Sequence, residues 1–166
     1  MSFAHSFLPE FDHEMQTTRA MLERVPEGNG GWKPHPKSMT LEQLALHIAS
    51  LPSWVTRGLK LDEFDLNPAG GRPSRRFESR AALLETFDAN VAEARAALEG
   101  SDGTDMTATW TLKSAGQVAM TMPRSAIVRS FAMNHLIHHR GQLSVYLRLN
   151  DVPLPMIYGP SADTKS

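Results

Sequence analysis

One segment near the C-terminus, residues 131–149, constrains the fold more than any other part of the chain. It carries three histidines, His135, His138 and His139, within five residues, and Gly141 is its single helix breaker. Apolar residues recur every three or four positions, a pattern that predicts an amphipathic helix with one stripe facing a core.

Two of these histidines are predicted to lie on that inward stripe. At about 100° of rotation per residue, His135 and His139 fall within roughly 40° of each other. The same line contains Val128, Phe131, Gln142, Tyr146 and Leu149. His138 lies about 60° off the line, and Arg140 points elsewhere. Two imidazoles one turn apart can close on a single metal ion. The alternative is a pair of core histidines, which would need partners for four ring nitrogens.

A second helix is expected to begin at Leu41. Thr40 and Gln43 have the spacing of a capping box, in which each side chain satisfies a backbone donor of the other residue. The inward line of this helix contains Leu44, His47, Leu51 and Trp54. His47 alone would be interpreted as a core histidine. Pro52 removes a helical hydrogen bond and is expected to kink the helix near His47.

A first helix is expected over residues 6–25, where a proline stops it. His13 falls opposite the apolar stripe of this helix, so His13, Asp12 and Glu14 are expected to be exposed. Residues 60–76 have the composition of a long connection. About 17 residues can return along a helix of about 30 Å, which permits the second and third helices to run parallel.

A third helix is expected over residues 77–99, ending at Gly100. Residues 104–122 alternate between apolar and polar side chains, which predicts a small β-hairpin. Pro123 suits the first turn of a fourth helix, and the apolar tail, residues 150–163, is expected to pack across the helices or on a partner subunit. The predicted fold is therefore all-α, a four-helix bundle with a long crossover between helices 2 and 3 and a small β-hairpin between helices 3 and 4.

Composition limits the available chemistry. The 166 residues are 41% hydrophobic and include no cysteine, so we expect a single domain over residues 1–166 whose metal ligands are histidine or carboxylate. The net charge is −1, which argues against a nucleic-acid face. The one arginine group is interpreted as a linker and first helical turn, and it comprises Arg72, Arg75, Arg76 and Arg80. No signal segment or membrane span is recognised, so we expect a soluble, cytoplasmic protein.

The stretch Asn134–Leu143, together with Tyr158–Asp163 and weaker matches in the second and third helices, resembles the DinB family of metal-binding four-helix bundles. The resemblance covers nearly the whole chain. It implies one divalent metal ion per chain, zinc or nickel, held by one histidine of the second helix and two of the fourth. These ligands correspond to His47, His135 and His139. His138 corresponds to a histidine that is not a ligand.

Three neutral imidazoles around zinc leave one coordination position open, which is typical of a reactive site. Similar proteins include thiol S-transferases that use bacillithiol or mycothiol, and a mycothiol-dependent isomerase. The leading hypothesis by resemblance is a metal-dependent transferase or hydrolase that activates a low-molecular-weight thiol, or a water, against a small electrophilic substrate. The resemblance also implies a homodimer. No residue is an evident general base, although Gln142 and Tyr146 are candidates to orient ligand or substrate.

Two other hypotheses remain open at this point. In the first, the metal is structural or sensory, and the protein acts by binding or dimerising, for example in a stress response. In the second, the chain is a helical bundle whose site is empty.

Overall fold

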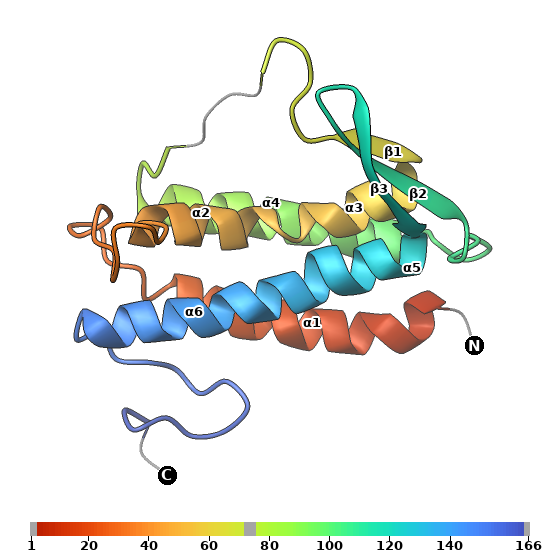
Figure 1. The fold of residues 1–166 in the computed structure, drawn as a ribbon. Helices are drawn as coiled ribbons and strands as arrows, with labels where there is room; N and C mark the ends of the chain where they lie inside the picture. Colours follow the sequence, from red (N-terminus) through yellow and green to blue (C-terminus); the bar gives the residue numbers. More distant parts are fainter. Residues whose placement is uncertain (1–2, 72–75, 165–166) are drawn as a thin grey trace.

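The computed structural model describes residues 3–71 and 76–164, which are mostly helical with a small three-stranded sheet (Figure 1). Along the chain the elements are α1 (Phe3–Leu22), α2 (Leu41–Ser50), α3 (Ser53–Lys60), β1 (Glu63–Asp65), α4 (Arg80–Glu99), β2 (Thr109–Ser114), β3 (Gln117–Pro123), α5 (Arg124–Ala126), the π-helical segment η1 (Ile127–Asn134) and α6 (His135–Leu149). Arg72 and Arg75 of the predicted linker lie outside the described residues. Within the described part, no helix has both the length and the apolar character that crossing a membrane requires.

The start of α2 and the break after it follow directly from the sequence. Thr40 Oγ1 accepts a hydrogen bond from the Gln43 backbone N–H at 3.3 Å, and Gln43 Oε1 accepts one from the Thr40 N–H at 2.9 Å. The predicted capping box is therefore confirmed. The helix is interrupted between α2 and α3, because Pro52 has no N–H to continue the hydrogen-bond ladder. This interruption lies about one turn beyond His47.

The predicted hairpin is present as the antiparallel pair β2–β3, in which Trp110 is paired with Met122. The strand β1 is not anticipated by the sequence pattern. It lies at the start of the crossover and pairs in parallel with β2, with Phe64 beside Leu112. Three residues within a stretch of loop composition carry too little periodicity to indicate a strand. The sheet lies at one end of the helices (Figure 1).

The helices pack pairwise around the core. The long connection after α3 leads back to the other end of the helices, so α4 runs in the same direction as α2 and α3, as the sequence permits (Figure 1). Both α1 and α2 contact α4 and α6, and α3 contacts α4 and η1. Gly58 allows the close approach of α3 to η1, since a Cβ at Gly58 would lie 2.8 Å from Ile127 Cγ2.

Several details differ from prediction. The helix α1 begins and ends about one turn earlier than expected, and α4 begins about one turn later, capped by Ser79 and ending at Gly100 as predicted. The expectation that Glu14 is exposed is wrong, because Glu14 is only 6% exposed. It lies four residues before buried Thr18 and three after buried Phe11, on the inward side of α1. His13 is exposed, as expected.

The fourth predicted helix is continuous from α5 to α6, but its middle part, η1, is π-helical. The His135 N–H donates to the Ser130 carbonyl, five residues back. A π turn holds about one residue more than an α turn, so it changes the angular relation between side chains before and after it. The tail that follows α6 packs on the core through Val152, Leu154 and Ile157, as expected for a segment lying across the helices.

Candidate metal centre

The structure brings three histidines together from two distant parts of the chain. His47 lies in α2, and His135 and His139 lie at the start of α6 and one turn further on. Each ring offers one nitrogen, and these three nitrogens all lie within 4.8 Å of one another. The ring centroids are separated by 4.9 Å for His47 and His135, 4.6 Å for His47 and His139, and 4.7 Å for His135 and His139. The triangle of rings is compact enough to hold a metal ion.

The best-defined side of this triangle has the length that a tetrahedral ion requires. His47 Nε2 and His135 Nε2 are 3.2 Å apart. Two imidazole nitrogens at about 2.0–2.1 Å from a tetrahedral zinc would be about 3.3 Å apart. The donor set, three nitrogens and no sulfur, suits zinc, nickel, copper or iron alike. The residues present therefore fit a divalent ion, and their chemistry leaves its identity open.

The rings of His135 and His139 each make one hydrogen bond to a neighbouring group. These hydrogen bonds orient the other ring nitrogen toward the centre of the three-histidine group. The amide oxygen of Gln142 accepts from His139 Nδ1 at 2.7 Å, which leaves His139 Nε2 unprotonated and free to bind. The His135 ring hydrogen-bonds to the backbone of Phe131, and this bond opposes the lowering of its pKa. Partners of this kind hold the tautomer and orientation of metal-binding histidines.

Burial keeps all three imidazoles neutral. Desolvation, with smaller contributions from the rings of His139 and His135, lowers the pKa of His47 to about 4. Desolvation also lowers the pKa values of His135 and His139, while the Gln142 hydrogen bond opposes this in His139. A neutral ring is the form that binds a metal ion. At neutral pH the group therefore has its ligand lone pairs available.

The histidine line of α6 is less buried than the sequence predicts. His135 and His139 are partly exposed, Gln142 is exposed, and Leu149 is 57% exposed. The stripe of α6 that faces the core is instead formed by Leu136, Arg140, Leu143 and Leu147, which are all buried. The prediction that the histidine stripe faces the core therefore holds for Val128, which is buried, and for Phe131 and Tyr146, which pack against the core. It is wrong for Gln142 and Leu149. The three histidines lie where α2 packs against α6.

Two other polar residues singled out by the sequence have definite places. Gln142 Nε2 donates to His138 Nε2 at 3.0 Å, so Gln142 bridges His138 and His139. His138 itself is exposed and lies outside the three-histidine group. The Tyr146 hydroxyl donates to the Met39 carbonyl at 3.3 Å, so Tyr146 packs against the loop before α2. Gln142 thus orients a histidine, and Tyr146 anchors a loop.

An aromatic pair flanks the group on the side of α3. Phe131 lies one turn before His135, and its ring packs against Trp54 with centroids 5.4 Å apart. Arg57 lies over the Trp54 ring, with its Cζ 4.9 Å from the centroid. An aromatic pair with an arginine beside it therefore lies at the α3 end, and the amide of Gln142 lies at the other end.

The sequence missed a buried ion pair between Glu14 and Arg140, which the exposed Tyr158 contacts through its hydroxyl. A signal for it exists in the spacing. Arg140 lies four residues after Leu136 and three before Leu143, so it belongs to the buried leucine stripe of α6. A charged residue at such a position requires a partner.

The fold and the three-histidine group define a mostly helical protein that could hold a metal ion. The chain belongs to the DinB family, whose model matches residues 1–165. No curated protein matched the sequence.

Among solved structures, the chain is similar to a DinB-like protein from Bacillus cereus, with 22% identity and a TM-score of 0.68 over 93% of this chain and 97% of that one. It is also similar to a DinB-like protein from Bacillus subtilis, with 19% identity and a TM-score of 0.66 over 94% of this chain and 99% of that one. At these identities the likeness concerns the fold alone.

Proposed function

We propose that the protein is a metal-dependent enzyme in which His47, His135 and His139 hold one divalent ion, zinc or nickel. The observation that carries the proposal is the meeting of three neutral imidazoles, with the Nε2 atoms of His47 and His135 3.2 Å apart. Two further facts support it. The rings are partly exposed, and membership of the DinB family agrees with metal binding.

The proposed substrate class comes from the resemblance to thiol S-transferases, and the chemistry of the ligands is compatible with it. A divalent ion with three histidine ligands and a free position acts as a Lewis acid and lowers the pKa of a thiol or a water. We propose transfer of a low-molecular-weight thiol to a small electrophile as the reaction, with hydrolysis as the variant in which water replaces the thiol. In this scheme Gln142 orients His139, and Phe131 and Trp54 provide an apolar wall beside the reacting molecule.

The test compares two neighbouring histidines. His135→Ala removes a proposed ligand, whereas His138→Ala alters a ring one turn away that lies outside the group. Zinc- or nickel-loaded protein is incubated with a panel of thiols and electrophiles, and turnover is followed with metal content and thermal unfolding. We expect turnover and metal content to fall in His135→Ala at unchanged fold, and to persist in His138→Ala.

Other outcomes point to the second hypothesis. Bound metal without turnover on any substrate pair, together with a His135→Ala variant that unfolds, would favour a structural or sensory role, since metal binding energy would then be folding energy. Absence of metal from freshly purified protein, and no uptake of added zinc or nickel, would overturn the proposal.

We also propose that the helices form a four-helix bundle and that the protein is a homodimer. The pairwise contacts of α1, α2, α4 and α6 support the bundle. Exposed apolar side chains support a dimer, and they include Val118, Met120, Val145 and Leu149. Light scattering on the purified protein tests the dimer.

A further inference from the structure

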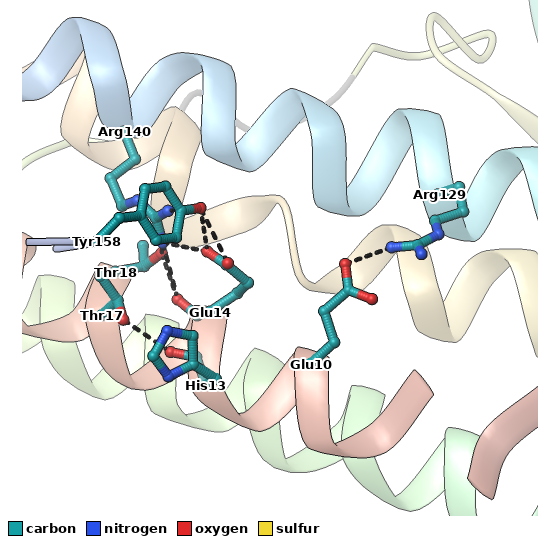
Figure 2. A network of polar contacts seen from close by, with 8 residues as sticks. All are labelled: Glu10, His13, Glu14, Thr17, Thr18, Arg129, Arg140 and Tyr158. Carbon is teal, nitrogen blue, oxygen red and sulfur yellow. Dashed lines mark hydrogen bonds and ion pairs between the residues drawn. The ribbon is translucent and has the colours of Figure 1, made fainter. Parts of the chain in front are cut away.

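A buried ion pair joins α1 to α6 on the side of α6 away from His47. Glu14 and Arg140 have side chains that are 8% and 2% exposed, and Arg140 Nη1 lies 2.6 Å from Glu14 Oε2 (Figure 2). The same Nη1 donates to the Glu14 carbonyl and to Thr18 Oγ1, both at 3.2 Å. Thr18 Oγ1 in turn donates to the Glu14 carbonyl at 2.7 Å. The Arg140 guanidinium therefore binds one turn of α1, through Glu14 and Thr18.

Such a pair is costly, because two charges lose their hydration when they are buried. An apolar pair of similar volume often stabilises a fold as well or better. The geometry of the pair gives a reason for the charges. The N–H groups of a guanidinium point in fixed directions, so the hydrogen bonds of Arg140 fix the position of α6 more narrowly than an apolar contact would.

Arg140 directly follows the proposed ligand His139. Successive side chains on a helix diverge by about 100°, so the two point to different neighbours, Arg140 to α1 and His139 to His47 of α2. At a side-chain radius of about 6 Å, a rotation of α6 by about 10° displaces a ring by about 1 Å. Metal and catalytic sites lose function at displacements of this size.

The C-terminal tail closes the pair from outside. The Tyr158 hydroxyl accepts a hydrogen bond from Arg140 Nη2 at 2.5 Å and approaches the Glu14 carboxylate oxygens at 2.9 and 3.0 Å. Its ring lies beside the guanidinium, with Arg140 Cζ 5.2 Å from the centroid. The tail is held elsewhere by Asp163, which pairs with Arg148 and accepts from the Leu154 N–H at 2.8 Å.

We propose that Glu14, Arg140 and Tyr158 are positioning residues for the three-histidine group, and that the tail, docked through Tyr158, holds α6 at the rotation in which His135 and His139 meet His47. The inference rests on the proposed metal site. It adds that the C-terminal tail, which is remote from the ligands, determines how tightly the three histidines bind the metal ion.

The test uses three variants of the full chain and two readouts. Tyr158→Phe keeps the ring and removes the hydroxyl. The double variant Glu14→Leu/Arg140→Met replaces the ion pair by apolar side chains and is expected to remain folded. The control is Glu10→Gln, which breaks the α1–η1 ion pair with Arg129, an exposed contact on the same helix (Figure 2).

The first readout is hydrogen exchange of the metal-free protein, which needs no metal site. We expect faster exchange in residues 135–141 for Tyr158→Phe and the double variant, and no change there for Glu10→Gln. The second readout is the zinc dissociation constant by chelator competition, with the visible spectrum of the cobalt-substituted protein. We expect affinity about tenfold weaker in Tyr158→Phe and the double variant, the range of outer-residue effects, with altered cobalt bands.

The two proposals fail in different ways. If the wild type binds no zinc or cobalt, the proposed function fails, and exchange alone decides whether the tail fixes α6. If the wild type binds zinc and the double variant is stable with wild-type affinity and cobalt spectrum, the positioning role is overturned. Exchange in residues 135–141 that is unchanged in Tyr158→Phe would overturn the role of the tail.

Discussion

His47 Nε2 and His135 Nε2 lie 3.2 Å apart although 88 residues separate them in the chain. No hydrogen bond within either helix requires this distance. It results from the packing of α2 against α6. Any change that moves one helix relative to the other should therefore be visible in metal binding first.

Removal of His47, the proposed ligand in α2, should abolish tight binding of zinc. In His47→Ala, two histidines of α6 remain, and a site with one ligand fewer should lose more than the roughly 10- to 100-fold that outer residues cost. Chelator competition with zinc measures the dissociation constant. His13→Ala is the control, because His13 is exposed on α1 and lies outside the group. Equal affinity of His47→Ala and wild type would remove His47 from the site.

The metal-free protein should lose stability as the pH falls below about 6.5. Desolvation lowers the pKa of folded His47 to about 4, whereas an unfolded histidine titrates near about 6.5. Between these values the unfolded chain binds more protons, so the free energy of unfolding falls as the pH decreases from 6.5 towards 4.

Urea unfolding of metal-free wild type and His47→Gln at several pH values measures this contribution. Carboxylates titrate in both proteins, so the difference between their free energies of unfolding at each pH isolates the contribution of His47. The slope of stability against pH should be smaller in His47→Gln. Identical slopes would show that His47 titrates alike in folded and unfolded chains.

Loss of the Gln142 amide should weaken metal binding with little effect on stability. Gln142→Leu removes the acceptor for His139 Nδ1, so the ring is free to turn or to change tautomer, and affinity should fall about tenfold. Gln142 is exposed, so the free energy of unfolding should change by less than about 0.5 kcal/mol. Calorimetric zinc titration measures the affinity, and Val145→Ala on the same helix is the control. A tenfold loss of zinc affinity in Val145→Ala as well would show that the effect comes from any change on the surface of α6 and not from the Gln142 amide.

Two glycines should respond in opposite ways to alanine. In Gly58→Ala the new Cβ would lie 2.8 Å from Ile127 Cγ2, so crowding should destabilise the protein by about 1–3 kcal/mol. In Gly141→Ala nothing lies within 4 Å, and better helix propensity should stabilise it by up to about 1 kcal/mol. Urea denaturation of metal-free protein measures both. A neutral Gly58→Ala would mean that α3 and η1 can move apart freely.

Local signals in the sequence predicted local structure well. The Thr40–Gln43 capping box, the break at Pro52 and the hairpin all follow from short-range rules and are confirmed. The meeting of His47 with the α6 histidines was implied by the resemblance to the DinB family, whereas His47 alone would be interpreted as a core histidine. Whether these rings hold an ion stays a prediction.

Features that depend on distant partners were not accessible. The strand β1 exists only because β2 pairs with it. The leucine spacing of α6 indicates that Arg140 is buried, but it does not indicate that its partner is Glu14 of α1. The π turn of η1 accompanies a close contact of α3 with Ile127, which a single-helix pattern does not contain.

The π-helical segment also carries an evolutionary consequence. A π turn accommodates about one residue more than an α turn, so a lineage that lost one residue from 127–134 could keep an unbroken helix and still be soluble. Every side chain upstream would then be displaced by about 100° relative to His135 and His139. The length of this short segment should therefore matter to the three-histidine group as much as the identity of the three side chains.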